Sequence, residues 1–276
     1  MMHKANQPER PALPPPFYMP FYYASLSSMW LFYPVATAPA RPFLDGTGLV
    51  PALFDGHAVA VIDFQRYSSH SSTSLDTTTE IEFSLLAYPQ ARKSQIPPSI
   101  SLEDFLAGKD QTKLIGHRRL HIPTDNRLAV EAGRALFGAP KFYTTFTYRV
   151  PSHNDPTVHT WSYTCHDPDG EGAIFSVEAD VRALSAAVTS SAPLTEYSVL
   201  DGELIGSHWN LLGTLETLYP NGSASESITL SLGRSQNQMR EDMDSIIGSS
   251  RPVAVQIFES APTAIEGRSF YVDVGA

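Results

Sequence analysis

Short stretches in which apolar and polar residues alternate, separated by turn residues, run through most of this chain. Alternation with a period of two is typical of a half-buried β-strand, because successive side chains point to opposite faces. Asp-Gly and Asn-Gly pairs, which favour tight turns, recur between the stretches. The predicted strands are 57–67, 80–88, 113–122, 142–150, 157–166, 204–219, 225–232, 253–260 and 265–272.

Helical patterns are few. The predicted helices are a single turn over 103–108 and amphipathic segments over 125–137, 178–188 and 237–247. In the second of these, Leu128, Ala132 and Leu136 share one face, and Thr124 or Asp125 is suited to cap the first turn. No strand–helix–strand rhythm occurs, so the pattern predicts an α+β fold, mostly antiparallel β, built as a barrel or sandwich with a few flanking helices.

Composition limits the partners. The chain of 276 residues has 19 Lys and Arg against 29 Asp and Glu, a formal net charge of −10, and its only basic cluster is the short run 117–119. We therefore expect no nucleic acid partner. The single cysteine, Cys165, excludes an intramolecular disulfide and a multi-cysteine zinc site. Prolines interrupt the apolar stretch 17–35, so we expect no membrane span and a soluble, cytoplasmic protein.

Residues 1–40 differ in composition from the rest of the chain. Proline is frequent up to residue 20, which favours extended backbone and cannot build a core alone. Aromatic residues are concentrated just after it, and such side chains gain much free energy from burial. We expect residues 1–40 to form an arm that docks on the main domain or on a neighbouring subunit, and residues 41–276 to form that domain.

Two histidines at a spacing of four, His117 and His121, raise the question of a metal site. On a helix this spacing suits chelation, but both lie in a predicted strand, where four residues span about 13 Å. We predict no metal site there.

A junction between a helix and a strand fixes one lysine. Gly138 is suited to the left-handed position at the end of the helix over 125–137, and Pro140 forbids its continuation. Lys141 then begins the next strand, with Tyr143 on the same face. Such a lysine is either an exposed residue at the rim of a barrel or a buried amine. Burial disfavours the ammonium form and favours a neutral nucleophile that can condense with a ketone.

The stretch AGRALFGAPKF resembles the signature of the acetoacetate decarboxylase family, in which a GR-x-x-x-G-x-P-K segment carries the Schiff-base lysine. The match falls on Gly133, Arg134, Gly138, Pro140 and Lys141. The resemblance implies an acetoacetate-decarboxylase-like β-barrel with a solvent-poor lumen, a homo-oligomer, a small keto-acid substrate, and no metal or organic cofactor.

Two upstream stretches resemble strands of the same family. AVIDF places an acidic active-site residue at Asp63, and TEI places a second catalytic carboxylate at Glu80. The resemblance implies that Lys141 forms the imine while Glu80 and Asp63 move protons and orient the substrate. The predicted substrate-binding residues are Glu82, Tyr143, Arg134 and Arg66, although Arg134 is also placed to hold the helix against the barrel.

The sequence departs from the family pattern at two places. Phe142 stands where the decarboxylase has a second lysine, and residues 24–30 lack the arginine thought to meet the substrate carboxylate. A carboxylate in a low-dielectric lumen is costly without a partner. Either Arg66, Arg134 or a more distant base replaces that arginine, or the substrate is not acetoacetate.

The sequence therefore predicts a Schiff-base-forming lyase acting on a small keto acid. The reaction is decarboxylation of a β-keto acid or related aldol or dehydration chemistry. The alternative is a non-catalytic barrel that binds a small molecule and retains only the fold.

Overall fold

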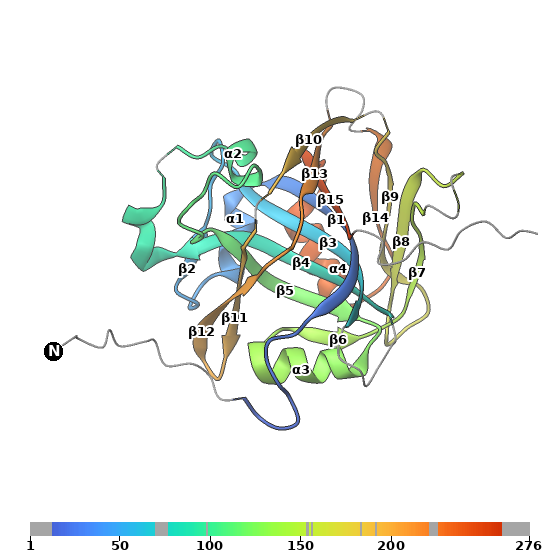
Figure 1. Cartoon of the computed structure of the whole chain (residues 1–276), viewed down its shortest axis with the longest axis horizontal. Helices are drawn as coiled ribbons and strands as arrows, with labels where there is room; N and C mark the ends of the chain where they lie inside the picture. Colours follow the sequence, from blue (N-terminus) through green and yellow to red (C-terminus); the bar gives the residue numbers. More distant parts are fainter. Residues whose placement is uncertain are drawn as a thin grey trace, which may run out of the picture.

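The computed structural model describes residues 13–69, 77–97, 99–152, 155, 157–182, 184–190, 192–220 and 226–260. Within these residues two β-sheets form the molecule (Figure 1). The larger sheet has eleven strands, in the spatial order β10 (Ser185–Thr189), β13 (Leu215–Tyr219), β15 (Ala254–Glu259), β1 (Tyr23–Val35), β3 (Ala58–Ser69), β4 (Thr77–Pro89), β5 (Gly116–Thr124), β11 (Leu194–Leu200) and β12 (Glu203–Trp209), with β2 (Leu49–Pro51) paired to β4 and β6 (Lys141–Tyr143) paired to β5.

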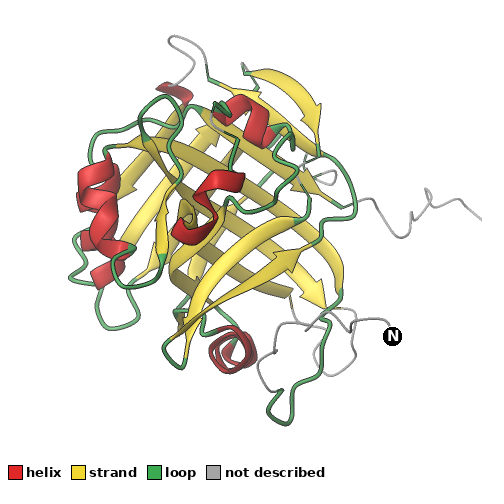
Figure 2. Cartoon of the chain, turned by 90° about the vertical axis from the view of Figure 1, so that its left-hand side faces the viewer, coloured by secondary structure: helices red, strands yellow, loops and turns green. Residues whose placement is uncertain are grey.

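Pairing in the large sheet is antiparallel except where β5 meets β6 and β11, which run parallel to it. The sheet curls into a barrel-like shape (Figure 2), but its end strands β10 and β12 do not pair with each other within the described part of the chain. The smaller sheet has four antiparallel strands, in the order β14 (Ile228–Leu232), β9 (Ala173–Asp180), β8 (Thr160–His166) and β7 (Phe146–Arg149).

Helices are short and lie outside the sheets (Figure 2). They are α1 (Thr37–Ala40), η1 (Arg41–Phe43), η2 (Gln90–Gln95), α2 (Leu102–Leu106), α3 (Arg127–Phe137) and α4 (Gln238–Ile247). No helix among the described residues is long and apolar enough to cross a membrane. The predicted fold class, mostly antiparallel β with a few helices, is confirmed.

The strands of the large sheet send alternate side chains into two cores. In β3, Ile62 and Phe64 join a core shared with the small sheet and α4, whereas Val59 and Val61 join a core on the other face. This alternation is the expected consequence of the pleat of a β-strand. It assigns each residue of β3 and β4 to one face or the other.

Several predicted elements are corrected by the structure. The segment 178–188 is not a helix but the end of β9 and the start of β10, because Phe175, Val177 and Ala179 alternate into the core with a period of two. The predicted strand 142–150 is broken between β6 and β7, and 204–219 is two strands, β12 and β13. The predicted strand 265–272 lies outside the described residues.

The N-terminal region contributes more to the sheet than its composition indicates. β1 lies between β15 and β3 near the middle of the large sheet, and Trp30 is 2% exposed. Part of the expected arm, residues 1–40, is therefore a central strand of the sheet that the main domain was expected to form. Before β1, the ring of Phe21 packs edge-on against Phe137 at 6.3 Å.

Candidate active site

The junction before β6 is built from a helix with well-defined ends. Asn126, rather than Thr124 or Asp125, caps α3, because its side-chain oxygen accepts hydrogen bonds from two N–H groups of the first turn. Gly138 ends the helix in the left-handed conformation, with φ of 54°, as the sequence predicted. A Cβ at Gly138 would also lie 2.1 Å from the carbonyl oxygen of Val199, so only glycine fits there.

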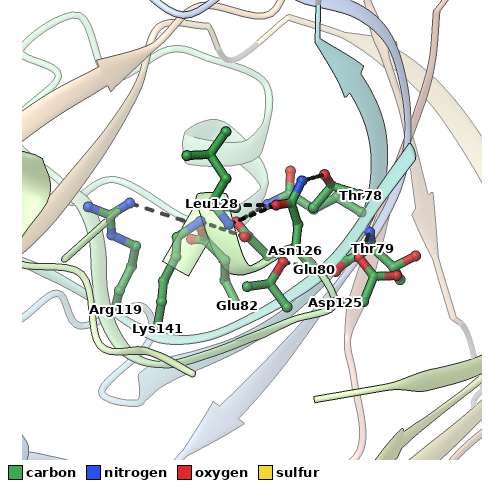
Figure 3. A network of polar contacts seen from close by, with 12 residues as sticks. Thr78, Thr79, Glu80, Glu82, Arg119, Asp125, Asn126, Leu128 and Lys141 are labelled. Carbon is green, nitrogen blue, oxygen red and sulfur yellow. Dashed lines mark hydrogen bonds and ion pairs between the residues drawn. The ribbon is translucent and has the colours of Figure 1, made fainter. Parts of the chain in front are cut away.

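The residues predicted to cap α3 instead tie the junction to β4. Asp125 Oδ1 accepts a hydrogen bond from the Thr79 N–H at 2.8 Å, and the Asp125 N–H donates to the Thr79 carbonyl at 3.1 Å. The Thr124 hydroxyl donates to the same carbonyl at 3.2 Å. These contacts (Figure 3) hold Glu80, which lies opposite Thr124 in the β4–β5 register, beside the start of β6.

Lys141 begins β6 and reaches over α3. Its side chain crosses the helix at Gly133, where a Cβ would lie 2.5 Å from Lys141 Cδ and 2.6 Å from Cε. Arg134 Nε donates a hydrogen bond to the Lys141 carbonyl at 2.8 Å. Arg134 of the helix thus fixes the backbone of Lys141, and Gly133 leaves room for the lysine side chain.

The Lys141 amine pairs with a buried carboxylate. Its Nζ donates to Glu80 Oε2 at 2.5 Å, and the two side chains are only 10% and 4% exposed. Gln65 Nε2 lies 3.5 Å from the other oxygen of Glu80. The amine therefore points into the protein and toward a proton acceptor, not into bulk solvent (Figure 3).

A cavity of about 720 Å³ opens beside this pair. Its polar lining includes a lysine, an arginine, three glutamates and a glutamine: Lys141, Arg119, Glu80, Glu82, Glu196 and Gln65. Its apolar lining is largely aromatic and includes Phe21, Tyr23, Tyr67, Phe137, Trp209 and Phe258. The segment 19–24 lines this cavity of its own chain. The size and mixed lining suit a small organic ligand with a polar group.

Arg119 is the second basic side chain of the cavity, and it was not among the predicted site residues. Its Nη1 lies 3.0 Å from Glu196 Oε2 and 3.9 Å from Glu82 Oε1. Its Nε and Nη2 donate to the Ser198 hydroxyl at 3.3 and 3.0 Å. Ser207 donates to the same oxygen of Glu196 at 3.1 Å. The guanidinium is therefore held from β11 and β12.

An irregularity in β5 decides which side chains face the cavity. The β4–β5 register shifts between Phe83 and Ser84, so that Arg119 lies opposite Ser84 and His121 opposite Phe83. Such a bulge re-aims the side chains that follow it. Arg119 faces the cavity, whereas His121 faces the other core and bonds through Nε2 to Asp242 of α4 at 2.6 Å. No group of three or more potential metal ligands forms among the described residues.

Burial and mutual repulsion perturb the acids of the cavity. The pKa of Glu82 is raised to about 8, first by burial and then by the charge of Glu196, against the opposing effect of Arg119. Burial, and then the charges of Glu80, Glu196 and Glu82, raise the pKa of Tyr23. At neutral pH the raised pKa therefore favours the neutral carboxylic acid form of Glu82.

Asp63 lies behind the cavity wall. It is 7% exposed, faces the same side of the sheet as Gln65, and lies opposite Glu82 in the β3–β4 register, but it does not line the cavity. Burial first, and then the charge of Glu82, raise its pKa well above the usual value. The structure thus puts Asp63 next to a residue of the site.

The predicted substrate-binding residues also differ in whether they line the cavity. Glu82 lines the cavity, but Tyr143, Arg134 and Arg66 do not. The Arg127 guanidinium lies 4.0 Å from the ring centre of Tyr143. Arg66 projects from the opposite face of β3, where its guanidinium lies 4.4 Å from the ring centre of Tyr148. The structure does not bring these three side chains to the cavity, and contact between any of them and a substrate stays a prediction.

The comparisons with known proteins bear on the fold. No family model matches the sequence, and no curated protein does. The structure is similar to that of the enduracididine biosynthesis enzyme MppR complexed with pyruvate, with a TM-score of 0.57 and 12% identity over 88% of this chain and 87% of that one.

Two further solved structures have the same fold. An acetoacetate decarboxylase-like enzyme from Sphingomonas wittichii RW1 matches with a TM-score of 0.51 and 12% identity over 87% of this chain and 89% of its own. Acetoacetate decarboxylase from Legionella pneumophila matches with a TM-score of 0.51 and 9% identity over 93% of each chain. The fold of this protein is acetoacetate-decarboxylase-like.

Proposed function

We propose that this protein is a Schiff-base-forming lyase that acts on a small keto acid through Lys141. The observation that carries the proposal is the buried pair of Lys141 and Glu80, 2.5 Å apart, on the wall of a cavity of about 720 Å³. The solved structures that share the fold are named as enzymes, and MppR is described in complex with pyruvate and with a condensation product of pyruvate.

The first step uses the short contact between the two side chains. Glu80 accepts a proton from the Lys141 ammonium, and the neutral nitrogen attacks the ketone carbon of the substrate. The former carbonyl oxygen takes up two protons and leaves as water, which produces an iminium.

With a β-keto acid, the carbon–carbon bond to the carboxylate then breaks. The bonding electrons move to the iminium nitrogen, carbon dioxide leaves, and an enamine remains. A proton added at the enamine carbon restores the iminium, and water releases the ketone and the lysine. In aldol or dehydration chemistry the same iminium and enamine form, but the carboxylate is kept.

Glu82 is suited to supply the proton that the enamine carbon takes. Its raised pKa of about 8 keeps it protonated at neutral pH, and it lines the cavity that contains Lys141. Asp63 lies opposite Glu82 on the neighbouring strand, also has a raised pKa and does not line the cavity, so we propose that it acts on Glu82 and not on the substrate.

Reductive trapping tests the proposal directly. The protein is incubated with pyruvate, acetoacetate or a longer β-keto acid, reduced with borohydride and analysed by peptide mass spectrometry. We expect substrate mass at Lys141, no adduct in Lys141→Met, and an unchanged adduct in Lys93→Met, which removes an exposed lysine outside the cavity. Failure of every keto acid to modify Lys141 would contradict the proposal. Product analysis separates decarboxylation from aldol or dehydration chemistry.

A non-catalytic binding protein is the alternative, and one observation favours it. Glu80 already satisfies the Lys141 amine, so the pair also works as a static element of a binding cavity. In that case Lys141→Met would retain most of the affinity for a ligand found by calorimetric screening of keto acids. A homo-oligomer remains a prediction, tested by light scattering.

A further inference from the structure

We infer that Arg119 recognises the carboxylate of the substrate and that Glu196 limits how tightly it does so. This inference rests on the proposed function, because it names the group that meets the acid half of a keto acid. It also chooses among the alternatives that the sequence left open for residues 24–30, which contain no cation: a more distant base meets the carboxylate.

Position within the cavity is the first argument. Among the described residues, the lysine and arginine side chains that line the cavity are Lys141 and Arg119, and the lining histidine, His208, is exposed. Arg66 lies on the opposite face of the sheet, and Arg134 bonds to a backbone carbonyl outside the cavity. Once Lys141 is bound to the keto carbon as an iminium, Arg119 is the cationic side chain still free to pair with a carboxylate taken out of water.

Donor capacity is the second argument. A guanidinium has five N–H donors. Two of those on Arg119 bond to Ser198 and one bonds to Glu196. Both Nη atoms therefore retain donor capacity for a carboxylate, the group that the fork of arginine binds best. The Ser198 contacts fix the plane of the guanidinium, so little entropy is lost on binding.

Competition is the third argument. Glu196 Oε2 accepts a hydrogen bond from Arg119 Nη1 at 3.0 Å and another from the Ser207 hydroxyl at 3.1 Å. A substrate carboxylate that approaches Arg119 must share the guanidinium with this acid and is repelled by it. Glu196 therefore positions Arg119 and also weakens its attraction for an incoming anion. Removing the charge of Glu196 while keeping its shape is expected to strengthen binding.

The experiment compares carbonyl compounds with and without a carboxylate. The concentration of pyruvate or acetoacetate that gives half-maximal borohydride trapping at Lys141 is measured beside that of acetone or methyl acetoacetate. We expect Arg119→Met to raise this half-maximal concentration at least tenfold for the two acids and less than threefold for the neutral compounds. Arg119→Lys should recover part of the loss. Glu196→Gln should lower it severalfold for the acids alone.

The outcomes separate this inference from the proposed function. If the unmodified protein traps neither acids nor neutral ketones, the proposed function fails and the inference fails with it. If it traps both, and Arg119→Met and Arg119→Lys weaken acids and neutral compounds equally or not at all, only the inference is overturned. Circular dichroism melts of each variant are the folding control. If Arg119→Met does not fold, Arg119→Lys and Glu196→Gln test the inference. A Glu196→Gln variant that binds the acids no more tightly than the unmodified protein overturns it.

Discussion

The two faces of the large sheet carry opposite chemistry on the same strands. Toward the small sheet, β3 and β4 present fully buried apolar residues such as Phe64 and Phe83. Toward the cavity the same strands present Gln65, Glu80 and Glu82, which are also buried. Burial of charge is costly and seldom adds stability even when the charges pair. Apolar residues on both faces form the cores, and the polar stretch on the second face supports the proposal that binding and chemistry take place there.

The largest expected effect tests the structural role of the apolar face. Phe64 is fully buried and its ring stacks on that of Tyr163 at 4.5 Å. We expect Phe64→Ala to lower the free energy of unfolding by about 3–5 kcal/mol, because it leaves a cavity in a packed core. Urea titration followed by circular dichroism measures this value. Val188→Ala, at a side chain that is 75% exposed, is the control. A loss below about 1 kcal/mol would show that this face is not the structural one.

On the cavity face, Glu82→Gln is expected to act in the opposite direction. Because the folded pKa is raised to about 8, the folded protein keeps a proton that the unfolded chain releases, and stability falls as pH rises from about 4.5 to 8. Glu82→Gln removes that loss and should raise the free energy of unfolding at pH 9 by up to about 5 kcal/mol, with a smaller gain at pH 5. Unfolding titrations at both pH values test it. Glu171→Gln, at an exposed acid, should leave the pH dependence unaltered.

A third test sharpens the contrast between fold and site. Gly133→Ala places a methyl group within 2.6 Å of Lys141 Cδ and Cε and must displace the amine from Glu80. We expect borohydride trapping at Lys141 to slow at least tenfold while the melting temperature changes little, because alanine favours the helix. Gly170→Ala, where the nearest contact is an ordinary 3.4 Å, is the matched control. Equal trapping rates in the two variants would refute the positioning role of Gly133.

The smallest expected effect concerns Arg66. Its stack on Tyr148 is worth about 0.5–1 kcal/mol. We expect Arg66→Ala to lower the free energy of unfolding by that amount and to leave keto-acid trapping unchanged, because the side chain projects away from the cavity. Arg66→Lys, which keeps the charge, serves as the comparison. If Arg66→Ala traps keto acids more weakly but neutral ketones equally well, Arg66 does take part in binding the acid.

Local sequence signals were sufficient for the lysine junction. Gly138 and Pro140 have conformational requirements that do not depend on the rest of the chain, so the end of α3 and the start of β6 at Lys141 follow from the residues themselves. The regular alternation of β3 and β4 likewise puts Glu80 and Glu82 on one face. These are the parts of the arrangement that neighbouring residues determine.

The remainder of the site depends on contacts between distant segments. Arg119 faces the cavity only because of a register shift in β5, and strict alternation cannot reveal a bulge. Glu196 reaches it through the parallel pairing of β11 with β5, 77 residues away along the chain. Tyr143 was expected beside Lys141 by alternation, but β6 ends at that residue. A charged residue inside a predicted strand was the available signal for Arg119, whereas Glu196 lies in β11, a strand that the sequence did not predict.

The place of β1 has a consequence for how the chain is made. One edge of β1 pairs with β3, which follows it closely, but the other pairs with β15, in which Ser27 lies opposite Glu259. During synthesis that second edge stays bare until the last described strand leaves the ribosome, so a nascent or prematurely terminated chain exposes a long, apolar edge that can pair with other chains. A truncated protein that lacks β15 is therefore expected to aggregate through this unpaired edge of β1.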